Sequence, residues 1–166
     1  MDFIYVKNSI RPLALVLYLL LHAPVPHSGS DVQIRLENRV EAPGTMRWTR
    51  TLSNTTSFAR PVTFTSRMVC SGEHRVIEFT KFGIGAEADL RVDAKGSLVY
   101  DIRNYVLRVP FLRLIARFPT WLSPLGGGRT LEIGETADIF RIEFEMTHPL
   151  FGRTLAYSGM CRIESS

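Results

Sequence analysis

Two carboxylates and a histidine near the C-terminal end of the chain are the residues whose types and spacing come closest to a catalytic arrangement. Glu143 and Glu145 are two positions apart, and His148 follows at a proline-containing corner. Such a set can act as general acid and base when burial separates the pKa values of the two carboxyl groups. In an extended strand, however, both carboxylates lie on the face opposite Phe144 and Met146, which we expect to meet solvent. An enzyme of unknown reaction, using His148 or an inward-facing acid, is therefore the last of three functional hypotheses.

Other residues with chemical potential are scattered. The two cysteines, Cys70 and Cys161, and the four histidines show no metal-ligand spacing, so we predict no metal site. The run 126–128 is glycine only and lacks the lysine and Ser/Thr of a phosphate loop, and no dinucleotide fingerprint is present, so we predict no cofactor. We expect both cysteines to be buried and reduced, and a single disulfide between them is the alternative for an exported protein.

Polar residues at positions that should be apolar are a more informative signal. In the alternating segments, Arg50, Ser66 and Asn104 each share a face with large apolar side chains of their own strand. A buried polar group must be hydrogen-bonded or it costs a few kcal/mol. These three residues therefore pair with each other, reach the rim, or line a pocket that holds water or a ligand. The predicted ligand-lining residues are Trp48, Arg50, Ser66, Tyr100, Asn104, Phe111, Phe118 and Trp121.

The elements that must position these residues are strands. From residue 31 onward, apolar and polar side chains alternate with period two, which indicates strands with one apolar and one polar face. Short turns connect successive segments, and short links require antiparallel neighbours because a parallel crossover needs about a dozen residues or more. The predicted strands are 31–40, 45–52, 62–70, 74–82, 84–93, 97–108, 129–134, 138–147 and 153–163.

Residues 109–128 interrupt this alternation with an apolar insertion. Phe111, Leu114, Ile115 and Phe118 fall on one face of a helix, and Pro119 and the proline at 124 would bound short helical turns. We expect the segment to pack across one end of the sheet. The alternatives are a movable lid over a cavity and a surface, within 109–124, that contacts a membrane without spanning it.

The first thirty residues allow two interpretations. Residues 13–21 are continuously apolar and follow Lys7 and Arg11, as in the core of a signal peptide, and they are too short to span a bilayer. The alternative is a buried helix with Ser9 as its N-cap, Pro12 in its first turn and Pro24 at its end. Spacing alone does not choose between a cleaved leader and a helix of the domain.

Composition limits the class of protein. A chain of 166 residues, 45% of them hydrophobic, can form one domain with a real core. The net charge is +4, and the basic residues are 17 arginines and only 3 lysines. Because most arginines alternate with acids instead of gathering with exposed aromatics, we expect a face of ion pairs and exclude nucleic acid as a partner.

Several short motifs resemble an uncharacterised bacterial family, domain of unknown function 4166. The motifs are GTMRWTRTL at 44–52, FTSR at 64–67, VIEF at 76–79 with Phe82-Gly83, Leu122 with Pro124, and HPLFG at 148–152 with Tyr157 and Gly159. Leu52 and Ile84-Gly85 depart from the family pattern, which has phenylalanine and Pro-Leu there. The resemblance implies a cytoplasmic accessory domain whose leading helix belongs to the fold, found alone or behind a saccharopine-dehydrogenase-like NAD(P)-binding domain. It transfers no catalytic residue and no NAD(P) site to this chain.

These observations predict an α+β fold. Residues 1–30 supply an apolar N-terminal helix, which packs on a curved antiparallel meander of eight or nine strands over 31–166, with a half-open barrel as its more curled form. The first functional hypothesis is a non-catalytic module that binds a hydrophobic small molecule or lipid between sheet and helix or lid. The second is a structural domain that docks on an NAD(P)-dependent enzyme. We expect a cytoplasmic protein, or an exported one if residues 1–23 act as a signal peptide.

Overall fold

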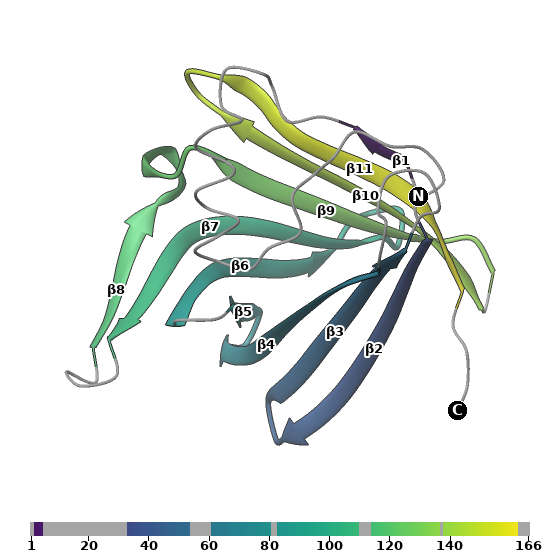
Figure 1. The fold of residues 1–166 in the computed structure, drawn as a ribbon, viewed down its shortest axis with the longest axis horizontal. Helices are drawn as coiled ribbons and strands as arrows, with labels where there is room; N and C mark the ends of the chain where they lie inside the picture. Colours follow the sequence, from purple (N-terminus) through teal and green to yellow (C-terminus); the bar gives the residue numbers. More distant parts are fainter. Residues whose placement is uncertain are drawn as a thin grey trace.

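The alternating segments form a single antiparallel sheet that curls into a half-barrel (Figure 1). The computed structural model describes residues 2–4, 33–53, 61–80, 83–109, 114–136 and 138–162. The order across the sheet is β1-β11-β10-β9-β7-β6-β5-β4-β3-β2, and β8 pairs with β7 beyond the end of β9. The strands are β1 (Asp2–Ile4), β2 (Gln33–Ala42), β3 (Thr45–Ser53), β4 (Val62–Gly72), β5 (Arg75–Phe79), β6 (Ile84–Val92), β7 (Leu98–Val109), β8 (Leu114–Pro119), β9 (Gly127–Gly134), β10 (Ile139–His148) and β11 (Gly152–Arg162).

The inner face of the half-barrel carries the main hydrophobic cluster. Met68, Val76 and Ala88 are buried there and contact side chains from β3, β6 and β7. Arg50 on β3 acts electrostatically on Tyr157 of β11, seven strand spacings away in the sheet order. In a flat sheet these strands would lie about 34 Å apart. The face that carries Arg50 and Tyr157 is therefore the concave one.

The outer face is covered by arginine–carboxylate pairs that cross from strand to strand. Asp89 on β6 accepts from Arg75 on β5 at 3.1 Å and from Arg103 on β7 at 2.8 Å. Asp101 is shared in the same way by Arg91 and Arg129, and Glu41 by Arg47 and Arg67. Hydrogen bonds from Arg103 and Arg75 hold the pKa of Asp89 below its usual value, despite partial desolvation. Alternation of arginine and acid along the sequence thus becomes a lateral ion-pair network.

The predicted α+β class is wrong. The described chain is almost entirely strand, and its helical element is the 3-10 turn η4 (Thr120–Leu122). The helix predicted between Ser9 and Pro24 lies outside the described residues, and residues 2–4, which precede it in the chain, form β1 against β11. All nine predicted strands are present, as β2 to β7 and β9 to β11, and the unexpected β1 and β8 bring the sheet of the described residues to eleven strands. None of the described helical segments is long and apolar enough to cross a bilayer.

The helical turns predicted around 111–118 are also wrong for the described residues, since 114–119 form β8. Leu114, Ala116 and Phe118 alternate with Ile115 and Arg117, so the stretch satisfies a strand period as well as a helix period. Extended pairing with β7 places Arg117 opposite Val106, from where it reaches a buried carboxylate on β6. Tertiary pairing therefore decides between two local patterns.

The two thiols are free and are not both buried as expected. Cys70 is exposed and Cys161 is partly buried. Cys70 lies where the β4–β5 register shifts beside the turn, so the alternation that would bury it ends at that residue.

Candidate functional site

A polar cluster on the inner face joins three neighbouring strands. Arg50 of β3, Ser66 of β4 and Glu78 of β5 meet because their registers place them on the same side of the sheet. Arg50 Nη1 donates to Glu78 Oε1 at 2.8 Å and to Ser66 Oγ at 3.0 Å. The Ser66 hydroxyl donates to the same Glu78 Oε1 at 2.6 Å. The three side chains form one closed triangle of hydrogen bonds.

Aromatic rings hold the guanidinium of this cluster. The Arg50 Cζ atom lies 4.7 Å from the centre of the Trp48 ring and 5.5 Å from that of Phe64. Both distances are within cation–π range, and the ring faces replace part of the lost hydration. Burial would lower the pKa of Arg50, but the charge of Glu78 outweighs this and the pKa is raised. The cluster therefore keeps a fixed positive charge in a mostly apolar setting.

The surroundings of the cluster are weakly solvated, as the raised pKa values of three other groups indicate. Burial raises the pKa of Tyr100 well above its usual value, and burial raises that of Tyr157 to about 12 while Arg50 opposes the rise. Burial also raises the pKa of Glu132, on β9. Phe144 stacks on Tyr157 with ring centres 4.7 Å apart. The floor around Arg50 is thus aromatic and weakly solvated.

Two buried donors at this place have no hydrogen-bond partner in the described part of the chain: Trp48 Nε1 and the Tyr100 hydroxyl. Trp48 is the residue under the Arg50 guanidinium, and Tyr100 is close enough for its charge state to be coupled to that of Arg50. An unpaired buried donor costs about 1–3 kcal/mol, so native proteins rarely keep one. Within the described residues, the place beside the partly buried Arg50 guanidinium thus has two donors available to a further acceptor.

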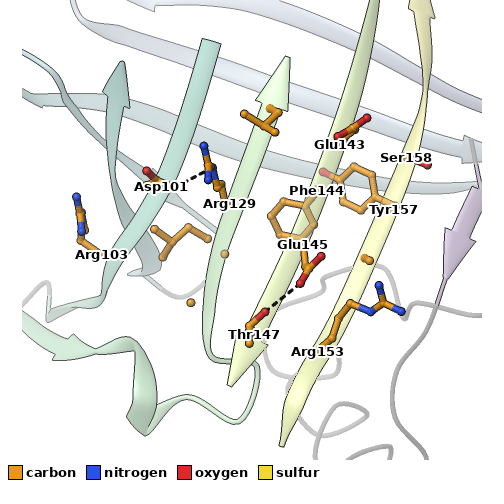
Figure 2. A pocket seen from close by; sticks show the side chains of 15 residues that line it. Asp101, Arg103, Arg129, Glu143, Phe144, Glu145, Thr147, Arg153, Tyr157 and Ser158 are labelled. Atoms are coloured by element: carbon orange, nitrogen blue, oxygen red, sulfur yellow. Dashed lines mark hydrogen bonds and ion pairs between the residues drawn. The ribbon is translucent and has the colours of Figure 1, made fainter. Parts of the chain in front are cut away.

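A second feature is a shallow hollow of ≈ 830 Å³ on the polar side of β7, β9, β10 and β11 (Figure 2). Its charged side chains have both signs, and several pair internally: Arg129 with Asp101 at 3.6 Å, and Thr147 with Glu145 at 3.2 Å. Arg103, at its side, is bound to Asp89. Because its charges largely satisfy one another, this hollow offers a ligand less than the inner cluster does.

Comparison with known proteins assigns a family to this chain but does not assign a reaction. The sequence profile of the family "Domain of unknown function (DUF4166)" matches residues 1–160, which is nearly the whole chain. The chain belongs to the DUF4166 family. No curated protein and no solved structure matches it. The function of this DUF4166 domain has to be argued from its own residues.

The structure of the DUF4166 domain brings together four of the eight residues predicted to line a ligand site: Trp48, Arg50, Ser66 and Tyr100 all lie on the inner face near the cluster. Phe118 and Trp121 are exposed on β8 and η4 instead. Phe111 lies outside the described residues.

Asn104 lies on the opposite face from Tyr100. The β6–β7 register shifts between Glu87 and Ala88, which inserts one extra residue into β7 and reverses the alternation beyond Ile102. Asn104 Nδ2 therefore donates to Glu87 Oε2 at 3.1 Å on the outer side.

Sequence reasoning missed Glu78, Glu132 and Tyr157 of the DUF4166 site. Glu78 is preceded by two buried apolar residues and followed by Phe79, so the run has no clean alternation. One feature of the sequence could have indicated Glu78. If 76–79 is a strand, Val76 and Glu78 are two residues apart and must lie on the same face. The roles of Glu132 and Tyr157 depend on the curl of the sheet, which no local pattern encodes.

His148, the candidate catalytic base, is buried and fully engaged with the backbone of the DUF4166 domain. Its Nδ1 accepts from the Leu150 N–H at 3.0 Å, and its Nε2 lies 3.0 Å from the Trp121 carbonyl oxygen, which requires Nε2 to donate. The ring also stacks on Phe151. These contacts fix the turn after β10 against η4 and leave neither ring nitrogen for proton transfer. The described residues contain no group of three or more His, Cys, Asp or Glu side chains placed to hold a metal ion.

Proposed function

We propose that the inner face of the half-barrel binds an amphipathic small molecule or lipid without transforming it, with the polar end of the ligand at the Arg50 cluster. The observation that carries this proposal is a pair of buried donors, Trp48 Nε1 and the Tyr100 hydroxyl, which have no partner among the described residues and lie beside the partly buried guanidinium of Arg50. A ligand with hydrogen-bond acceptors at this place would satisfy these donors.

The donors define the chemistry of the polar end. Tryptophan and arginine can only donate, and the carboxylate of Glu78 is already shared by Arg50 and Ser66. The site therefore has a surplus of donors, and its complement is an acceptor such as a carboxylate, a carbonyl or an ester oxygen. Aromatic and aliphatic neighbours on the same face, including Phe64 and Phe144, suit an apolar body.

Binding is favoured over catalysis by the way the cluster is closed. A serine becomes a nucleophile when a neighbouring base is free to take its proton. Here the oxygen that receives the Ser66 hydrogen bond, Glu78 Oε1, also receives the one from Arg50. This oxygen of the carboxylate is shared with the Arg50 guanidinium and is not free to take the Ser66 proton.

The test uses 8-anilinonaphthalene-1-sulfonate, an apolar fluorophore with an acceptor group. We expect saturable binding by the full chain, with Tyr100→Phe raising the dissociation constant about five- to tenfold, since one hydrogen bond to the ligand is lost. The same substitution should raise the free energy of unfolding of the unliganded protein by about 1 kcal/mol, because it removes an unpaired buried hydroxyl. Fluorescence titration and urea unfolding measure the two effects.

Tyr105→Phe is the matched control, since Tyr105 lies on the same strand but its hydroxyl is used. It donates to the Gly126 carbonyl oxygen at 3.0 Å. This variant should lose about 1 kcal/mol of stability and bind the dye as the wild type does. Equal dye affinity of wild type and Tyr100→Phe would sink the proposal, and so would the absence of saturable binding.

A further inference from the structure

We propose that one end of the half-barrel is a surface that contacts an anionic lipid bilayer, an inference that goes beyond small-molecule binding and does not depend on it. The surface, called the end patch below, consists of large apolar side chains that remain exposed on β8, on η4 and in the turn between β10 and β11. Leu150 is 83% exposed and Trp121 is 60% exposed. The other members are Leu114, Ile115, Phe118 and Leu122.

The parts of the end patch are fixed to one another. His148 binds the Trp121 carbonyl oxygen through Nε2 and the Leu150 N–H through Nδ1, so the 3-10 turn and the β10–β11 turn share one side chain. The Thr154 hydroxyl donates to the Leu125 carbonyl oxygen at 2.5 Å just behind them. In Figure 1, β8, η4 and this turn lie along the same side of the half-barrel. Trp121 and Leu150, the two most exposed members, are therefore held together on a rigid base.

The chain segments that carry the end patch contain no acidic residue, although Glu143 and Glu145 line the same hollow as Arg153. No aspartate or glutamate occurs from residue 102 to 131 or from 146 to 162, and the first stretch contains five arginines. Arg108 pairs with Ile115 in the β7–β8 register, and Arg153 follows Leu150 by three positions; neither forms an ion pair within the described residues. Both are exposed. Arg117 is the exception, because its charge is balanced by Glu87 beneath it.

This combination fits a bilayer surface. Trp at a membrane interface combines an apolar ring with a polar N–H, and neighbouring Leu side chains enter the acyl boundary. Arginines beside them are attracted to anionic headgroups. Trp121 and Leu150 sit on turns instead of lining a groove, so their side chains can enter a soft layer together. A second copy of the chain is a poorer occupant, since it would bring Arg108 and Arg153 toward their own equivalents.

The experiment measures partition of the full chain onto vesicles by co-sedimentation. One set of vesicles is phosphatidylcholine alone, and the other contains phosphatidylglycerol as well. We expect the wild type to bind the anionic vesicles about tenfold more strongly than the neutral ones, with the difference shrinking as salt is added. Brominated phosphatidylglycerol should quench tryptophan emission, since Trp121 would enter the interface.

The variant Trp121→Ser/Leu150→Ser should lower the partition coefficient at least about tenfold. Its matched control is Val40→Ser/Val92→Ser, which also removes two exposed apolar side chains, 75% and 67% exposed. Val92 pairs with Leu98 at the end of β6 remote from β8, and Val40 lies on β2, the edge strand six steps from β8 in the strand order. The control should bind vesicles within about twofold of the wild type. Circular dichroism and thermal unfolding establish that both double variants are folded.

Four results would overturn the inference. They are no binding to anionic vesicles, equal binding to neutral and anionic vesicles, equal binding by the end-patch variant and the wild type, and a dimer in sedimentation velocity that only the end-patch variant dissolves. The last result would assign the end patch to a second copy. None of them changes the dye affinity expected for Tyr100→Phe, so failure here and failure of the small-molecule proposal are distinguishable.

Discussion

Gly126→Ala is expected to abolish folding at 37 °C. Gly126 follows η4 with φ of +79°, a region that L side chains rarely adopt. A Cβ atom there would overlap the Thr147 carbonyl oxygen and would lie 2.7 Å from the Cα atom of His148. Both obstacles are backbone of β10 and cannot rotate away. The Gly126 N–H donates to Ser123 and its carbonyl oxygen accepts from Tyr105, so the glycine cannot move either.

Alanine variants of two other glycines distinguish the steric clash expected at Gly126 from the backbone strain of a positive φ. Gly152 also has a positive φ, +69°, but nothing lies within 4 Å of its Cβ position, so Gly152→Ala should lose about 1–2 kcal/mol. Gly134 has open space and no positive φ, so Gly134→Ala should change stability by less than about 0.5 kcal/mol. Circular dichroism and urea unfolding of the three variants make the comparison. If Gly126→Ala were no less stable than Gly152→Ala, the close approach of η4 to β10 would be refuted.

Most of the sheet could be predicted because short-range sequence patterns determine its strands. Period-two alternation and short turns define β2 to β7 and β9 to β11, each within a few residues of the predicted strand. Alternation also fixes the face of each residue, which is why Trp48, Arg50 and Ser66 could be assigned to one side before their contacts were known. Their hydrogen bonds link residues 16 positions apart and could not be predicted from spacing.

The remaining features depend on contacts between distant residues. β8 is extended by pairing with β7, which brings Arg117 to Glu87, 30 residues earlier, and neither partner is visible in the sequence of 109–124. One extra residue in β7 places Asn104 on the outer face, and a register shift of this kind reverses every later side chain of the strand. Tyr157 faces Arg50 only because the sheet curls. Bulges and curvature are properties of strand pairs and sheets, so a single segment does not reveal them.

The second large effect on stability is expected at Glu87, the hydrogen-bond partner of Asn104. This carboxylate is 1% exposed on the outer side of β6. Arg117 Nε donates to both of its oxygens at 3.2 Å, Arg117 Nη2 donates to Oε1 at 3.2 Å, and Asn104 binds Oε2. Burial raises the pKa of Glu87, but the hydrogen bonds from Arg117 and Asn104 outweigh burial and hold the pKa below its usual 4.5. The β8 strand therefore supplies the main countercharge of a buried acid.

Arg117→Met is expected to lower the free energy of unfolding by about 3 kcal/mol at pH 7, because it leaves the Glu87 charge buried with only a neutral amide as close partner. Arg103→Met is the matched control on the same face. Asp89, the partner of Arg103, is more exposed and keeps Arg75, so this variant should lose less than about 1 kcal/mol. Urea unfolding at pH 7 compares the two variants with the wild type.

The pH dependence of the free energy of unfolding shows whether the stability lost in Arg117→Met comes from the uncompensated charge of Glu87. In the wild type the folded pKa lies below the unfolded one, so the contribution of Glu87 is present above pH 4.5 and is lost as the pH falls through the folded value. Without Arg117, burial dominates and the folded pKa should lie above 4.5, which reverses the sign. Arg117→Met should then recover stability relative to the wild type between pH 7 and pH 5. Adding Glu87→Gln to Arg117→Met should remove this recovery and raise stability at pH 7, since no buried charge remains. If the free energies of unfolding of Arg117→Met and the wild type differed by a constant amount between pH 7 and pH 5, Arg117 would stabilise the fold by packing and not by balancing the charge of Glu87.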